Sequence, residues 1–159
     1  WFVYSAATGL QKFLGLNTST GATSNSGVYT SVTDTTFTNN ISSTSRTYIN
    51  YCFTSITSYQ KVGSYNGGSS GSSNVITTGF KPSFLIVKRT DQAGDAWQMF
   101  DSTMAGADTF DSYLQANTAA AEASYNLREV NFTNTGFYWT YAESGTNISG
   151  GTYIYLAIK

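Results

Sequence analysis

The sequence predicts an all-β fold, an antiparallel β-sandwich of the jelly-roll or concanavalin-like kind. Segments rich in Tyr, Phe, Val, Ile and Thr recur between clusters of Gly, Ser, Asn and Asp, which is the pattern of short strands joined by turns. Apolar residues almost never recur at helical spacing. With 159 residues the chain has the size of one domain, so we expect one module over residues 1–159.

Six segments are the clearest strand candidates, because each is short, rich in strand-forming residues and bounded by turn residues. They are Tyr48–Ile56, Phe84–Arg89, Ala96–Asp101, Val130–Thr133, Gly136–Tyr141 and Thr152–Lys159. Weaker candidates lie near the start of the chain, at Phe2–Tyr4, Leu10–Leu16, Val28–Ser31 and Asp34–Phe37.

Two of these segments show which faces they bury. In Tyr48–Ile56 the side chains alternate, and the face that carries Ile49, Tyr51 and Phe53 is mostly apolar. We expect this face to point inward, and we expect Cys52, the only cysteine, to be buried as a small apolar side chain. Thr152–Lys159 is apolar on both faces, which predicts a central strand or a strand at an interface.

Two other stretches interrupt the strand pattern. Residues 114–124 contain three consecutive alanines (Ala119 to Ala121), which favours a short helix or a compact loop, and the sequence leaves both open. Residues 66–74 are rich in Gly and Ser, and we interpret them as a surface loop inside one sandwich rather than a linker between two subdomains. Pro82 precedes the Phe84 strand and is expected at its entry corner.

Little in the sequence points to catalysis. Histidine is absent, which removes Ser-His-Asp and Cys-His catalysis and His-ligated metal sites. A glycosidase needs two facing carboxyl groups, and the sharpest enzymatic hypothesis pairs Glu122 or Glu129 with Asp101. The loop Thr90–Asp95 lacks the closing Glu of a calcium-binding EF-hand, so we interpret it as a polar turn. We therefore predict no enzyme and assign no catalytic, cofactor-binding or metal-binding residue.

Charge and hydropathy limit the kinds of partner and the location that we expect for this chain. Charged residues make up 11% of the sequence, and the net charge is −1. Lys and Arg form no basic stripe, so we expect no nucleic-acid partner. No apolar run approaches the ~20 residues of a membrane span, so we expect no membrane insertion. A surface of hydroxyl and amide groups suits a particle surface or a secreted, extracellular protein. Because the sequence opens on Trp1 without a Met, we expect a fragment or processed product, such as the C-terminal part of a longer chain.

Aromatic residues make up 16% of the sequence, more than a modest sandwich core readily absorbs. Core packing is the ordinary role of each ring, but Tyr and Trp are also favoured at interfaces because they combine a large rigid area with a polar group. Their rings also stack on sugars. The candidate contacts for a subunit interface or a glycan are Tyr59, Tyr65, Trp97, Tyr138, Trp139 and Tyr141.

Several motifs follow one another in a recognisable order. Tyr48–Tyr65 reads YINYCFTSITSYQKVGSY, Thr78–Pro82 reads TGFKP, and Gly150–Tyr155 reads GGTYIY. In this order the sequence resembles a domain of unknown function common in structural and tail-fibre-like proteins of environmental, often marine, tailed phages. That domain often follows a laminin-G or concanavalin-like domain. The resemblance covers Tyr48–Lys159 and, more weakly, Tyr4–Phe37.

The chain departs from the family pattern at Gln60 and Val62, where Ser and Phe are more usual, and at Ser69, where Asn-Gly usually precedes. The family has no assigned catalytic residues to carry over. The resemblance implies a β-sandwich of a virion, in a tail fibre, a host-recognition appendage or a capsid-surface protein.

We therefore expect a structural or adhesive module of a virion surface or tail fibre that self-associates into a repeated assembly. Its expected partners are further copies of itself or other virion structural proteins. Two alternatives stay open: a carbohydrate-binding, lectin-like host-recognition module that contacts a host surface glycan, and a subunit of a secreted bacterial surface filament.

Overall fold

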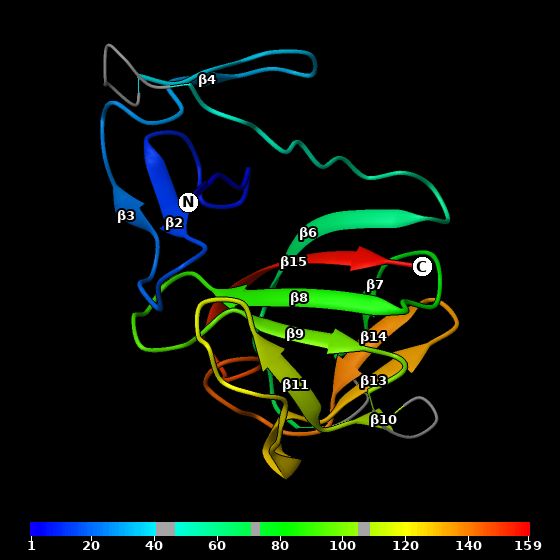
Figure 1. Ribbon diagram of the computed structural model, residues 1–159. Coiled ribbons are helices and arrows are strands. Elements are labelled where there is room, and N and C mark those ends of the chain that lie inside the picture. Colours follow the sequence, from blue (N-terminus) through cyan, green and yellow to red (C-terminus); the bar gives the residue numbers. More distant parts are fainter. Residues whose placement is uncertain (41–46, 71–73, 105–108) are drawn as a thin grey trace.

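The computed structural model describes residues 1–40, 47–70, 74–104 and 109–159, and it confirms the predicted all-β sandwich (Figure 1). The larger sheet has six antiparallel strands in the order β12-β11-β9-β8-β15-β6. Their bounds are β6 (Gln60–Asn66), β8 (Phe84–Arg89), β9 (Gln98–Asp101), β11 (Ser112–Gln115), β12 (Ala123–Ser124) and β15 (Thr152–Ile158).

The smaller sheet has four antiparallel strands in the order β10-β13-β14-β7. Their bounds are β7 (Ile76–Thr77), β10 (Thr109–Phe110), β13 (Val130–Thr133) and β14 (Gly136–Trp139). The main hydrophobic core lies between the two sheets, because the buried apolar side chains of both point toward one another. Its buried members are Ile76, Phe80, Leu85, Val87, Phe100, Val130, Phe132, Phe137, Trp139, Tyr153, Tyr155 and Ala157.

A second, smaller core lies on the other face of the larger sheet. There the N-terminal strands β1 (Phe2–Val3), β2 (Lys12–Gly15) and β3 (Thr23–Ser24) form a three-stranded sheet. Leu14 from β2 packs with Trp97 and with Ile154 from β15, and the Trp97 indole N–H donates a hydrogen bond to the Gly15 carbonyl at 2.8 Å. A separate two-stranded hairpin follows, formed by β4 (Ser31–Val32) and β5 (Phe37–Thr38).

The central strand of the larger sheet confirms the prediction from its pattern. β15 pairs with β8 on one side and with β6 on the other along nearly its whole length. Tyr153, Tyr155 and Ala157 enter the main core, whereas Ile154 enters the second core. Because both faces are covered, both faces are apolar. Pro82 is buried two residues before β8, at the strand entry that the sequence predicts.

The predicted strand Tyr48–Ile56 is wrong. The described chain passes through this segment without strand pairing, except for an isolated bridge between Ile56 and Gln60, and the strand begins only at Gln60. Cys52, expected to be buried, is exposed. The alternating pattern is present, but a strand also needs a partner strand to bond, and no described strand pairs with residues 48–55.

Residues 114–124 also differ from the helix alternative. β11 continues to Gln115, a turn follows, and the chain returns as β12, with Ser112 opposite Ser124 and Tyr113 opposite Ala123. The Asn117 side chain accepts a hydrogen bond from the Trp97 amide at 2.9 Å, which holds the turn against the neighbouring chain. The helix seen in the described residues is one 3-10 turn, η1 (Asn126–Arg128). No described helix is long and apolar enough to cross a membrane.

The Gly/Ser-rich loop joins β6 of the larger sheet to β7 of the smaller one. Of the predicted loop 66–74, residues 71–73 lie outside the described residues. Gly67 donates a backbone hydrogen bond to Gly151 at 2.8 Å, and Gly68 donates one to the Asn147 side chain at 3.0 Å. A side chain at Gly67 would meet the Ile148 carbonyl oxygen at 2.0 Å, so the close approach of the two chains requires glycine there.

Candidate functional site

The most exposed apolar segment of the described chain is Tyr48–Tyr59, which we name the arm. Ile49 is 77% exposed, Tyr51 68% and Phe53 57%. The arm runs as an extended trace from the N-terminal hairpin to β6 and lies apart from the sheets along much of its length (Figure 1). Contiguous exposed apolar side chains of this kind typically mark an interaction surface.

In the described part of the chain, the hydrogen bonds that hold the arm lie at its C-terminal end. Ile56 and Gln60 exchange two backbone hydrogen bonds, of 2.8 and 2.9 Å, and the Gln60 side chain donates to the Thr54 carbonyl at 2.7 Å. The Ser55 hydroxyl accepts from the Val62 amide at 3.2 Å and donates to the Val62 carbonyl at 3.3 Å. Among the described residues, nothing hydrogen-bonds to residues 48–53.

The six predicted contact residues do not form one surface. Tyr59 in the arm is 54% exposed and Tyr141 is 38% exposed, whereas Tyr138 is half-buried. Trp97, at 5% exposed, and Trp139, at 1%, pack in the second and the main core respectively.

Tyr65, the sixth residue, also belongs to the main core. Its ring stacks on Tyr153 with centroids 4.9 Å apart, and its hydroxyl donates to the Thr146 carbonyl at 2.5 Å and accepts from the Trp139 indole at 3.0 Å. Burial raises the pKa of the Tyr65 phenol well above its usual range. Of the six predicted contacts, Tyr59 lies in the arm. The arm's other exposed aromatic residues, Tyr48, Tyr51 and Phe53, belong to the segment that the sequence predicts as a strand with an inward apolar face.

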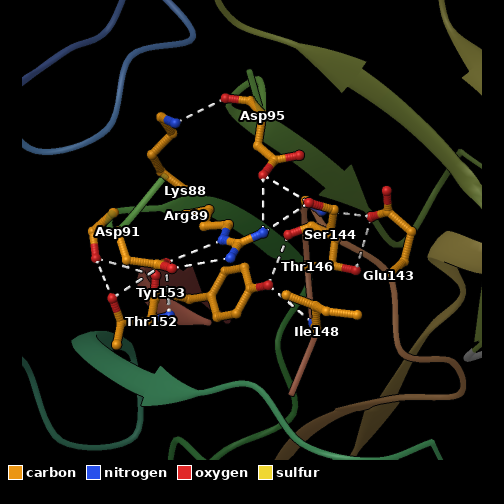
Figure 2. Close-up of polar contacts among 12 residues, drawn as sticks. Lys88, Arg89, Asp91, Asp95, Glu143, Ser144, Thr146, Ile148, Thr152 and Tyr153 are labelled. Carbon is orange, nitrogen blue, oxygen red and sulfur yellow. Dashed lines mark hydrogen bonds and ion pairs between the residues drawn. The ribbon is translucent and has the colours of Figure 1, made fainter. Parts of the chain in front are cut away.

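A polar cluster lies where β8 and β15 meet the loops that follow Arg89 and precede Thr152 (Figure 2). The Arg89 guanidinium forms a two-pronged pair with Asp91, with both N–O distances 3.0 Å, and its Nη1 lies 3.5 Å from the Asp95 carboxylate. Ser144 accepts from Arg89 at 2.8 Å and donates to Asp95 at 3.0 Å. The hydrogen bonds from Arg89, and a further one from the Thr152 amide, lower the pKa of Asp91 to about 2.

A second ion pair continues this cluster. Arg128 donates two hydrogen bonds of 3.1 Å to Glu143, and the Gly145 amide donates a third to the same carboxylate at 2.9 Å. The Arg128 guanidinium also lies 4.8 Å from the centre of the Tyr113 ring. Since each carboxylate is held by an arginine, the cluster's evident role is to fasten loops to the sheets.

Neither cluster resembles a metal or acid–base site. The described residues contain no group of three or more His, Cys, Asp and Glu side chains placed to hold a metal ion. Of the carboxylates weighed for a glycosidase, Asp101 accepts from the Thr103 amide at 2.8 Å, and Glu129 accepts from Thr140 and Asn131. The arm remains the candidate functional site.

The burial of Lys88, beside Arg89, leads us to predict that the stability of the fold depends on pH. It is 0% exposed and donates from Nζ to the Asp95 carbonyl at 2.8 Å (Figure 2). Burial lowers its pKa from 10.5 to about 8. Between these values the unfolded chain binds a proton that the folded chain lacks, so the free energy of unfolding rises with pH.

We expect Lys88 to raise the free energy of unfolding by about 2 kcal/mol between about pH 7.5 and pH 9.5, as measured by urea unfolding. Lys88→Met should remove the rise, whereas Lys61→Met on β6 should keep it. A Lys88→Met curve parallel to that of the unmodified protein would contradict the assignment. Above about pH 10 stability should fall, because burial raises the pKa of Tyr153 to about 12 and the unfolded tyrosine ionises first.

The domain of unknown function DUF7483 matches the chain over residues 1–159. This confirms the expectation of a domain of unknown function, whereas a phage origin and laminin-G neighbours stay predictions. No curated protein and no solved structure matches the chain. Because the match spans the whole sequence, the chain belongs to the DUF7483 family of domains of unknown function.

Proposed function

We propose that this domain is a structural or adhesive module of a virion surface or tail fibre, and that it self-associates through the arm into a repeated assembly. The single observation that carries the self-association is the exposure of Ile49, Tyr51 and Phe53 in residues 48–53, the part of the arm that makes no hydrogen bond to the described chain. Burying such side chains is favourable, and a second protein surface is the means of burying them.

The virion part of the proposal has separate support. The ordered motifs resemble a family of phage structural proteins, and only 11% of the residues are charged. A surface with few charges opposes close packing of identical subunits less than a highly charged one does. Immunogold labelling of purified native particles with an antibody to the domain would test it, and a particle-free secreted protein would contradict it.

Self-association is favoured over glycan binding by where the aromatic rings lie. The two tryptophans considered for sugar stacking are 5% and 1% exposed, and their indole N–H groups already donate to Gly15 and Tyr65. In the arm, by contrast, four aromatic side chains are exposed, namely Tyr48, Tyr51, Phe53 and Tyr59.

The test is sedimentation velocity of the unmodified chain and of the double variant Tyr51→Ser, Phe53→Ser. We expect the unmodified chain to associate and the variant to bind itself roughly 100-fold more weakly, because each lost side chain removes about 1.5 kcal/mol or more of apolar burial. The matched control is Tyr125→Ser with Leu127→Ser, which removes two side chains exposed by 40% and 39% at η1. Equal association of the arm variant and the control, or a monomeric unmodified chain, would overturn the proposal.

A further inference from the structure

We propose that two copies of this chain exchange arms, so that the arm of each copy adds to the β6 edge of the other as a seventh strand of the larger sheet. This inference rests on the proposed self-association and names its partner and register. Four features support it: the open edge, the register, the match of faces, and the turn that joins the arm to β6.

The edge of the larger sheet at β6 is open. Among the described strands β6 is the last in the order and has β15 as its one neighbour, and its outer side carries the single bridge from Gln60 to Ile56. Because Gln60 bonds to Ile56 on the outer side, alternation along the strand turns the backbone groups of Val62, Ser64 and Asn66 outward as well. Val62 bonds to the Ser55 hydroxyl, whereas the outward groups of Ser64 and Asn66 have no hydrogen bond to the described residues.

The bridge between Ile56 and Gln60 defines the register that a paired arm would take. Continued antiparallel, it places Thr54 opposite Val62, Cys52 opposite Ser64, and Asn50 opposite Asn66. The intervening residues pair in the same register, with Phe53 opposite Gly63 and Tyr51 opposite Tyr65.

This register matches the faces of the two strands. Residues directly opposite each other share a face of the sheet, and Tyr65 points into the main core. Ile49, Tyr51 and Phe53 would therefore lie on the core side, while Asn50 and Cys52 would lie beside the exposed Ser64 and Asn66. A shift by one residue would reverse every side chain, so the agreement selects this register.

The partner edge is assigned to a second copy because the chain's own arm does not follow β6 beyond the bridge at Gln60. The Ser55 hydroxyl takes both Val62 backbone groups that Thr54 would need, and the arm leaves the sheet at that point. The turn between Ile56 and Gln60 also holds Ser58 at a φ of 60°, a left-handed conformation that costs a residue other than glycine about 1 kcal/mol. Short turns under strain favour exchange of the segments they join, and a twofold axis would satisfy both arms and both edges.

Cysteine cross-linking tests the pairing directly, because Cys52 is the only cysteine and Ser64 is exposed. In the proposed register positions 52 and 64 form a hydrogen-bonded pair, whose Cα atoms lie about 5.5 Å apart, a separation that a disulfide or a short bis-maleimide can span. We expect Ser64→Cys to give a covalent dimer on a non-reducing denaturing gel, with the bond between positions 52 and 64 identified by peptide mass. Adding Cys52→Ser should abolish that bond.

The matched control is Ser124→Cys on β12, an exposed position at the opposite edge of the same sheet. It should give no bond between positions 52 and 124. A bond between 52 and 64 within one chain would show that the arm closes on its own β6 and would overturn the exchange. Self-association without any bond between 52 and 64 would also overturn it, yet leave the proposed function standing, whereas a monomeric chain would overturn both.

Discussion

Replacing Trp139 with alanine is expected to lower the free energy of unfolding by about 3–5 kcal/mol. Trp139 is 1% exposed and lies edge-on to Phe100 and Phe137, with ring centroids 5.3 and 6.0 Å away. Its removal leaves a cavity at the centre of the main core, because the strands on either side are fixed by their own pairing. It also removes the indole N–H bond to the Tyr65 hydroxyl.

Urea unfolding followed by tyrosine fluorescence or circular dichroism would measure the effect. Tyr138→Ala is the matched control, because Tyr138 is the preceding residue of β14 and points to the other face, where it is half-buried. We expect this control to lose less than about 1.5 kcal/mol. If Trp139→Ala lost no more than Tyr138→Ala, Trp139 would not be the centre of the core.

The strands of the sandwich could be predicted where burial leaves a local signature. Phe84–Arg89 is β8 with the predicted bounds, and Val130–Thr133 is β13 with the predicted bounds. The terminal strand was also predicted, because a strand covered on both sides needs apolar residues at every position. Near the N-terminus, four short strands overlap predicted candidates that are longer or shifted in sequence, namely β1, β2, β4 and β5. β3 (Thr23–Ser24) was not predicted, because it contains no apolar residue.

The arm shows that a local sequence pattern does not establish whether a segment pairs as a strand. Ile49, Tyr51 and Phe53 alternate with polar residues as a strand would, but pairing depends on a partner that lies elsewhere in the fold or in another chain. Conversely, β6 (Gln60–Asn66) was missed because its sequence, QKVGSYN, is polar with a glycine, and its pairing comes from the long neighbouring β15. A glycine is required within it, since a side chain at Gly63 would meet the Tyr155 ring at 2.7 Å.

The candidate contact residues failed to form one surface for a similar reason. Trp97 and Trp139 could not be assigned to an inner face from the sequence, because their strands carry apolar residues on both sides. The polar cluster around Arg89 was missed altogether. Asp91 and Asp95 lie in the loop after β8, whereas Ser144 lies in a loop 49 residues beyond Asp95, and their shared partner Arg89 is evident only once the sheet brings the two loops together.

The ion pair between Arg128 and Glu143 leads to the second large prediction. The side chains are 15% and 12% exposed, so water screens the charges weakly. Arg128→Ala would leave the Glu143 carboxylate with two donors, the Gly145 amide and the Thr146 hydroxyl, in place of four. We expect the free energy of unfolding to fall by about 3–5 kcal/mol, because an unpaired buried charge costs more than the pair contributes.

Three further variants separate the charge from the packing. Lys12→Ala removes an exposed cation from β2 and should change stability by less than about 0.5 kcal/mol. Arg128→Lys keeps the positive charge but loses the two-pronged hydrogen bonding of the guanidinium. Its loss in the free energy of unfolding should lie between those of Lys12→Ala and Arg128→Ala. The double variant Arg128→Met, Glu143→Leu removes both charges while keeping similar volume, and should recover much of the loss. If the double variant were instead as unstable as the sum of its two single changes, the pair would act through packing alone, and the fastening of the Glu143 loop by charge would be refuted.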